Sequence, residues 1–444
     1  MSANSGANRV IAAGHTSEPG RRFGALQVAG LLVSASYGIG FLFGSGEMAA
    51  AHGMAGSLYG LATAAGMLLL ALLAPRLWAA GVPIWALFGR GYGAPLSNSV
   101  ALLSVVWMAG VLAAQIHGGA VVFQMLGMPE WVALGTVLAA IYGASRLDLG
   151  AASRLLPILL AAASAILVWV LVADGGGTVY AQTPSRLAVD AAQLGPVAVG
   201  ALVLGVVALV VTGADYHQFV LAASRPRTAV QGCIAAAAFL ALLSPLPAAV
   251  VIAMGEAGHL AGLADAKQVI PQAIAGAASR LAQGVDKVML LVLSFAALGS
   301  GAAILRAMTD ALGAVAVTRQ TSRVQHRALI ALAAGGLLAL RDQGIVQTMV
   351  SINLVYIGSV SVLFAATLLG RWASPRRALA SVVLGFVASF TTYLAVWHWA
   401  AGAVGELMVV GAGIVASALA WWVVLPDALR ARPLSLPGSA LPPR

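Results

Sequence analysis

Charged residues are scarce in this sequence. Lysine, arginine, aspartate and glutamate make up 9% of its 444 residues, whereas 61% are hydrophobic and the mean hydropathy is +0.95. Soluble domains carry about 25% charged residues, so this composition excludes an ordinary soluble fold. Apolar runs of ~18 or more residues recur along the chain, each long enough to cross ~30 Å of hydrocarbon. They lack the alternation of barrel strands, and the sequence therefore predicts an all-α integral membrane protein.

Cysteine and the common catalytic motifs are also nearly absent. The single cysteine, Cys233, excludes an intramolecular disulfide and a cysteine-rich metal site. No His-Glu-x-x-His zinc motif, Gly-x-Ser-x-Gly elbow or phosphate-binding Gly-x-x-x-x-Gly-Lys-Ser/Thr loop occurs in the sequence. These absences argue against an intramembrane enzyme and against a primary pump within this chain, and we expect no organic cofactor.

The basic residues present are distributed unevenly among the loops. The apolar runs predict twelve spans, at about 24–46, 53–75, 98–126, 130–145, 153–173, 192–213, 228–254, 287–306, 326–340, 344–369, 378–399 and 403–425. With both termini inside, only five of the 24 basic residues face outward, namely Arg186, Lys267, Arg280, Lys287 and Arg341. This bias follows the positive-inside rule and predicts a bacterial-type inner membrane, with the inner arginines meeting anionic lipid headgroups. The net charge of +10 thus predicts no nucleic-acid partner.

Glycine is concentrated in the first span. Residues 38–46 contain Gly38, Gly40, Gly44 and Gly46, and glycine costs up to ~1 kcal/mol per helix position relative to alanine. The cluster predicts a helix broken at mid-membrane, where its backbone lines a cavity; the alternative is close helix packing through small residues. The sixth span, with its Gly195–Pro196 pair and with Gly213, is a weaker second candidate for a broken helix.

Spans one and six are the first helices of two five-span halves, as two inverted repeats require. We therefore predict a transporter core over 24–370, with repeat one at about 24–173 and repeat two at about 192–369. Two peripheral helices would occupy 371–425. A cytoplasmic segment, 1–23, would precede the core, and a disordered tail, 426–444, would follow.

Three stretches resemble the sodium:solute symporter family. The stretch Gly38–Gly60 is similar to the first core helix of that family and its exit, and Gly213–Arg225 is similar to its sixth-helix exit. Leu293–Asp310 is similar to its small-residue eighth helix, which ends in an aspartate. The resemblance extends over roughly 22–425. It implies a leucine-transporter-type core with broken helices 1 and 6, alternating access, and solute import driven by a cation gradient.

Two features depart from that family. Its members usually carry an extra helix before the broken one, whereas only residues 1–23 precede it here. The resemblance also implies a sodium site, made by the backbone at Gly38 and Gly40 with Ser294 as a hydroxyl ligand. Phe295, Ala296 and Ala297 beside Ser294 supply no side-chain oxygen. Coupling to sodium, coupling to protons and uncoupled transport therefore all stay open.

Polar and aromatic residues near the break are the predicted substrate ligands. Ser36, Tyr37 and Phe41 surround it, and the half-helix ends there can hold a polar or anionic solute. In span three, Gln115 and His117 suggest a polar cavity wall, although a neutral structural histidine is an equal alternative. In span ten, Asn353 and Tyr356 are polar at mid-depth, and Tyr356 is a candidate outer gate.

Other ionisable residues lie toward the ends of predicted spans. Glu47 could bind a cation or simply lie at the water interface. Asp215 and His217 mark the predicted inner end of span six, where Arg225 and Arg227 could form a gate with them; an ordinary solvated helix end is the alternative. Arg306 and Asp310 lie on one helix face and suit anchoring at the inner interface.

The leading functional hypothesis is a secondary active transporter for a small polar or anionic organic solute. A membrane sensor or partner-binding module that keeps the transporter fold without coupled transport is the alternative, as is a proton-coupled carrier. The expected partners are a small-molecule solute and membrane lipid. No motif encodes the identity of the solute or the oligomeric state.

Overall fold

The computed structural model describes residues 21–260, 265–315, 323–340, 344–399 and 402–423. Most of the N-terminal segment and the whole predicted tail lie outside these ranges. The described chain is almost entirely helical, and the one β-bridge found in it pairs Phe23 with Ala223. The all-helical prediction is thus confirmed.

The first half of the chain begins with two short helices in place of one span. Its elements are α1 (Ala25–Ser36), α2 (Ile39–His52), η1 (Gly53–Ser57), α3 (Leu58–Ala80), α4 (Ile84–Tyr92), α5 (Ala94–Met125), α6 (Glu130–Ser145) and α7 (Leu149–Ala173). Helix α7 starts where Asp148 accepts hydrogen bonds from the amides of Gly150 (2.6 Å) and Ala151 (3.1 Å). The amides of Ala151 and Gly150 lower the pKa of this exposed carboxyl group.

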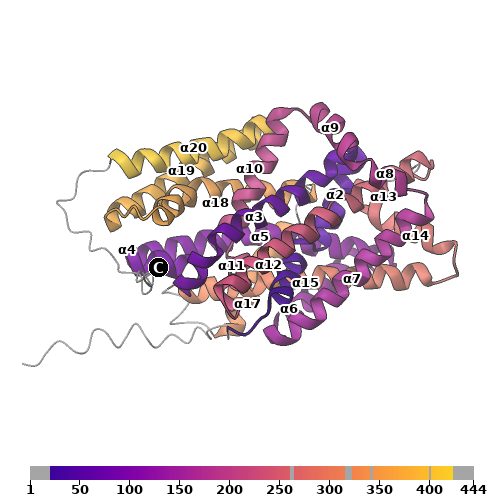
Figure 1. Ribbon diagram of the computed structural model, residues 1–444, viewed down its shortest axis with the longest axis horizontal. Helices are drawn as coiled ribbons and strands as arrows, with labels where there is room; N and C mark the ends of the chain where they lie inside the picture. Colours follow the sequence, from indigo (N-terminus) through magenta and orange to yellow (C-terminus); the bar gives the residue numbers. More distant parts are fainter. Residues whose placement is uncertain (1–20, 261–264, 316–322, 341–343, 400–401, 424–444) are drawn as a thin grey trace, which may run out of the picture.

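The second half repeats this order. Its elements are α10 (Pro196–Thr212), α11 (Ala214–Ala222), α12 (Pro226–Leu243), α13 (Pro245–Glu256), α15 (Val285–Ala314), α17 (Val324–Ala339) and α18 (Ile345–Leu368). Short helices connect the spans: α8 (Gly177–Ala181) and α9 (Thr183–Leu194) before α10, and η2 (Ala266–Gln268) and α14 (Val269–Ser279) before α15. Helices α19 (Pro375–Trp399) and α20 (Gly402–Val423) follow, packed on each other and on α18 along one side of the molecule (Figure 1).

Among the described residues, twelve passes are obtained when each broken helix counts as one. Length and apolarity alone identify eight spanning stretches in the described residues, or nine with α9 and α10, which meet at 109°. The four passes that fall short as single helices are the divided pairs α1–α2 and α10–α11 and the 16-residue helices α6 and α17.

Predicted span six had the wrong boundaries. Its first helix, α10, begins at Pro196, after the bend at Gly195. Gly213 does not end the span but interrupts it, because α11 continues to Ala222. Hydropathy placed the end at residue 213 because Asp215, His217 and Gln218 follow at once. These polar residues are inside the span.

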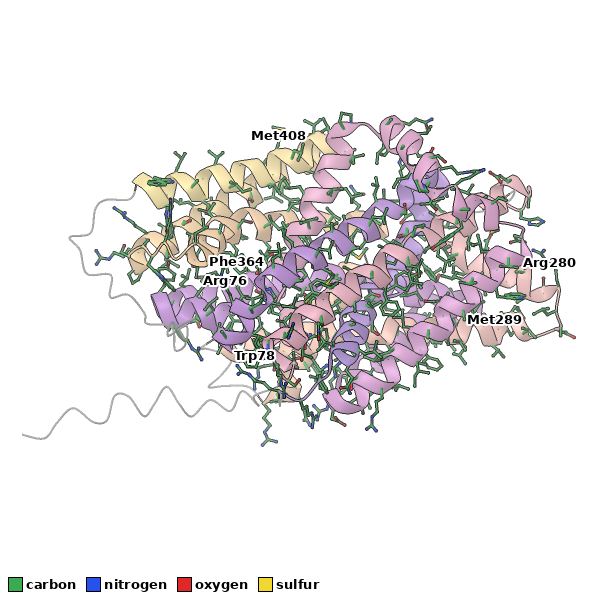
Figure 2. All side chains as sticks on the ribbon, viewed as in Figure 1. Arg76, Trp78, Arg280, Met289, Phe364 and Met408 are labelled. Carbon is green, nitrogen blue, oxygen red and sulfur yellow. The ribbon has the colours of Figure 1, made fainter. Side chains whose placement is uncertain are left out.

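The two ends of the molecule can be told apart by the elements and the charged residues that they contain. We call the end formed by α8, α9 and α14 the outer end and the end formed by α4 the inner end, following the predicted orientation. Arg280 lies at the outer end, and Arg76 and Trp78 lie toward the inner end (Figure 2). At the outer end Arg280 pairs with Asp174, and Arg186 pairs with Glu256 at 2.7 Å.

Candidate functional site: two broken helices

The first break lies between α1 and α2, at Tyr37 and Gly38. Gly38 has an extended backbone (φ −83°, ψ −179°) that any residue adopts, so its backbone conformation does not require glycine. The lack of space around it does require glycine, because a Cβ at Gly38 would lie 2.5 Å from Gln115 Oε1 and 2.5 Å from Ser300 Cβ. The glycine therefore lets the break approach α5 and α15 closely.

Side chains from these two helices satisfy backbone groups freed by the break. Gln115 Oε1 on α5 accepts a hydrogen bond from the Gly40 amide at 3.0 Å. Ser300 Oγ on α15 donates to the Ala35 carbonyl at 2.6 Å. Both side chains are buried, at 1% and 0% exposure. The end of α1, the start of α2, α5 and α15 thus form one polar junction inside the bundle.

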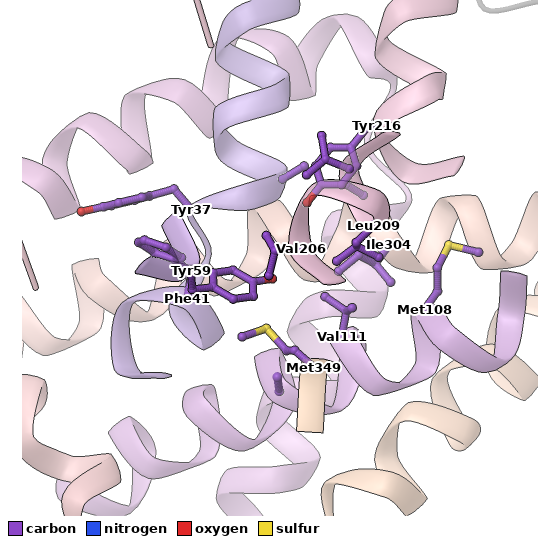
Figure 3. Packing of buried hydrophobic residues seen from close by; sticks show 14 of the residues in the cluster. Tyr37, Phe41, Tyr59, Met108, Val111, Val206, Leu209, Tyr216, Ile304 and Met349 are labelled. Carbon is purple, nitrogen blue, oxygen red and sulfur yellow. The ribbon is translucent and has the colours of Figure 1, made fainter. Parts of the chain in front are cut away.

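Aromatic side chains cover one side of this junction. Tyr37 and Phe41 have ring centroids 4.7 Å apart, and Phe41 and Tyr59 on α3 have centroids 5.7 Å apart (Figure 3). The Tyr37 hydroxyl donates to the Leu243 carbonyl at 3.1 Å, where α12 ends. Ser36 donates to Leu32 within its own helix and lies next to Tyr216. The three predicted ligands of α1 and α2 are therefore together at the break.

The second break, at Gly213, is held by side chains from α18 and α11. The Tyr356 hydroxyl on α18 donates to the Thr212 carbonyl at 3.2 Å, and His217 Nε2 lies 2.9 Å from the Val211 carbonyl. Gln218 Nε2 donates to the carbonyls of Asp215 (2.8 Å) and of Ala303 on α15 (3.3 Å). Tyr356 thus lies at the break in span six, and its role as an outer gate stays a prediction.

Three polar side chains near this break have unused hydrogen-bonding capacity among the described residues, and one of them is His217, through its Nδ1. Asp215, predicted at a solvated inner end, is 2% exposed, and its Oδ1 has no hydrogen-bond partner among the described residues. Asn353 is 1% exposed, and neither Oδ1 nor Nδ2 has a partner within the described ranges. Buried polar atoms are rarely left unpaired, so these atoms mark a place where another molecule can bind.

His117 lies apart from the two breaks. It lines a pocket of about 260 Å³ near the outer end with Gln124, Glu130, Asp265 and Lys267, and its Nδ1 is 3.3 Å from the Ala339 carbonyl. Residues two apart on a helix point about 200° apart, so His117 and Gln115 face opposite sides of α5. Placing His117 in the central site was therefore wrong.

The backbone and hydroxyl groups predicted for sodium are occupied elsewhere. Ser294 donates to Leu290 within α15 at 3.0 Å, and the Gly38 carbonyl accepts from Leu42 in the first turn of α2 at 3.0 Å. Gly40 lies within α2. The hydroxyl of span eight that reaches the break belongs to Ser300, six residues beyond Ser294. The oxygen atoms gathered at the break are thus those of Ala35, Ser300 and Gln115.

Contacts at both ends hold the half-helices in place. At the outer end, Glu47 Oε2 accepts from the Ile345 amide at 2.9 Å, and Asp190 accepts from the Met54 amide at 2.6 Å. Glu47, predicted either to bind a cation or to lie at the water interface, thus connects α2 to the start of α18. At the inner end, Phe23 and Arg22 donate backbone hydrogen bonds to the Ala222 carbonyl, both at 3.2 Å.

No protein-family model and no curated protein sequence matches this chain. Its structure is similar to that of a Na⁺-coupled sialic acid symporter in a substrate-bound outward-open state, with a TM-score of 0.69, 14% identity, and 90% of this chain and 91% of that chain covered. It is also similar to Mhp1, a nucleobase-cation-symport-1 family transporter with bromovinylhydantoin bound (TM-score 0.57, 12% identity, 90% and 92% covered).

A third similar structure is a manganese transporter of Eremococcus coleocola, with a TM-score of 0.57, 12% identity, and 92% and 96% of the two chains covered. These three proteins transport different substrates, so what they share with this chain is the fold. The leucine-transporter-type fold, with five spans in each half and a broken helix at the start of each, is confirmed.

Proposed function

We propose that this chain is a secondary active transporter that imports a small polar organic solute by cation symport and alternating access. The observation that carries the proposal is the pair of helix breaks buried in one bundle, which places unpaired polar groups at mid-membrane. Such breaks are costly in a membrane and are tolerated where they line a site. The fold shared with symporters supports the same function.

We propose sodium as the coupling ion, bound where α1 meets α15. Hard cations bind oxygen atoms. The Ala35 carbonyl and the Ser300 hydroxyl already meet there, and the Ser34 carbonyl lies 3.6 Å from the position of a Cβ on Gly299. Ser34 Oγ has no hydrogen-bond partner among the described residues and can turn toward the same place. The sodium-coupled neighbour favours this ion over the proton.

The positive-inside bias supports insertion in a bacterial-type cytoplasmic membrane, with both termini inside and the inner arginines at anionic lipid headgroups. In this orientation the outer half-helices of the two broken spans are α2 and α10. The substrate ligands we propose are Tyr37, Phe41, Asn353 and Tyr356. Gln115 positions α2 through the Gly40 amide.

Uptake into proteoliposomes tests the proposal. The full-length protein is supplied with a labelled metabolite panel under an inward sodium gradient or an inward proton gradient, each repeated after an ionophore has dissipated it. We expect accumulation of one class of solute driven by sodium and abolished by the ionophore. Tight binding without uptake under either gradient would contradict transport and favour the sensor alternative.

A further inference from the structure

We propose that the solute is an organic cation, with its positively charged nitrogen bound by Asp215 and its polar part by Asn353. This inference rests on the proposed function and narrows its substrate class. It is carried by the burial of an unpartnered carboxylate near three tyrosines, with an unpartnered amide on the helix that contacts the same break.

Asp215 is placed to receive a positive charge. It is the second residue of α11, a nine-residue helix, and its carboxylate lies over Gly213, where Oδ1 would be 2.7 Å from an added Cβ. A helix N-terminus favours a negative charge, which helps to keep the carboxylate ionised when a cation is bound. Its unpartnered Oδ1 is the atom that remains for the ligand.

Three tyrosine hydroxyl groups lie near the carboxylate. Asp215 is close enough to interact electrostatically with the hydroxyl groups of Tyr59, Tyr216 and Tyr356, which come from α3, α11 and α18. Tyr59 continues into the stack with Phe41 and Tyr37. Aromatic faces attract ammonium groups through cation–π interactions, and aromatic cages are used to bind quaternary ammonium ions. A carboxylate beside such rings is therefore suited to an organic ammonium ion.

Asn353 lies on the same interior face of α18. Val346, seven residues earlier, lies against Gly44 of α2, with Cγ2 2.7 Å from the position of an added Cβ. Tyr356, three residues later, is bonded to Thr212. Positions three and seven apart share a helix face, so Asn353 lies on the face of α18 between its contact with α2 and its contact with the second break. Its free amide and carbonyl can bind a hydroxyl or carbonyl group of the solute.

Among the described residues, no basic side chain forms an ion pair with Asp215. On the packed helices, Arg76 of α3 and Arg306 of α15 lie toward the inner end, and His117 of α5 faces the outer pocket. His217 is turned to the Val211 carbonyl and stacks on Phe364 at 6.3 Å. Burying an unpaired charge is expensive, so the site favours an occupant that brings positive charge and disfavours an anion.

Binding to the purified full-length protein tests the inference with defined probes. Choline and ethanolamine are the cations, 3,3-dimethylbutan-1-ol is the neutral isostere of choline, and lactate and N-acetylneuraminate are the anions. We expect a rise in the unfolding temperature with a cation alone. In Asp215→Asn the binding of that cation should weaken by at least about 30-fold, the usual result of removing one partner of a buried charge pair. Asp148→Asn, which removes an exposed carboxylate, should leave cation binding unchanged.

Several results would overturn the inference. Absence of cation binding, equal binding of choline and its neutral isostere, or unchanged cation binding by Asp215→Asn would each do so. The comparison of choline with its isostere uses the unmutated protein, so it tests whether the site selects a positive charge even if Asp215→Asn fails to fold. Accumulation of an anion or a neutral solute without cation binding would sink the inference and leave transport standing. Cation binding without uptake would contradict transport and leave the inference about the ligand standing.

Discussion

The hydroxyl of Ser300 holds two helices together at the first break. It donates to the Ala35 carbonyl across the α1–α15 contact, whereas the hydroxyl of Ser294 on the same helix donates to Leu290 within α15. The two serines therefore form a matched pair: one joins two elements, and the other serves only its own helix.

Replacing Ser300 with alanine should weaken sodium dependence. The substitution removes one proposed ligand and leaves the Ala35 carbonyl without its donor, a loss of about 1–3 kcal/mol for a buried group. We expect the sodium concentration for half-maximal uptake to rise about 10-fold or more. Ser294→Ala should leave it unchanged, and the opposite pattern would place the ion at Ser294.

Close packing between α2 and α5 explains why glycine is needed at the start of α2. A Cβ at Gly40 would lie 2.8 Å from Gln115 Nε2 and 3.2 Å from the backbone carbon of Ala114. The glutamine can turn away, but the backbone of α5 cannot. The start of α2 is thus fixed against α5 by the absence of a side chain.

Gly40→Leu should abolish uptake while the protein still inserts into the membrane. The added side chain forces α2 away from α5, an overpacking cost of typically 1–3 kcal/mol that a protein with twelve passes can survive. Gly200→Leu is the control, because nothing lies within 4 Å of a Cβ added at that exposed position of α10. Uptake is measured beside membrane abundance, and normal uptake by Gly40→Leu would contradict the site.

The molecule as a whole is tied at its outer end by Glu47. This carboxylate joins the outer half of span one to the start of span ten through the Ile345 amide. Nearby, Val346 is buried against Gly44 at 8% exposure. In the proposed alternating access, we expect opening toward the outside to separate α2 and α18 at this contact.

Glu47→Ala should therefore favour an outward-open state. A cysteine introduced at Val346 reports the opening, because the only native cysteine, Cys233, is buried. We expect an impermeant maleimide to label Val346→Cys about 10-fold faster when Glu47→Ala is also present, as the loss of ~1.4 kcal/mol from one charge-assisted hydrogen bond implies. Glu256→Ala removes the partly exposed pair with Arg186 and should not change the rate. Equal labelling in all three backgrounds would show that Glu47 does not control opening.

The sequence by itself determined the membrane architecture. Apolar runs and arginine bias predicted an all-helical chain of twelve passes, because each span must satisfy its own backbone in lipid and so carries its signal locally. The glycine cluster likewise located the first break. Tertiary structure decided what lies at each break. Gln115 and Ser300 reach the first break, whereas His117 and Ser294 do not. Asp215 is buried at the second break instead of lying at the end of the span. These assignments depend on the direction in which each side chain leaves its helix and on which helix it then meets. Distances between segments far apart in the chain fix both, and no local pattern encodes them.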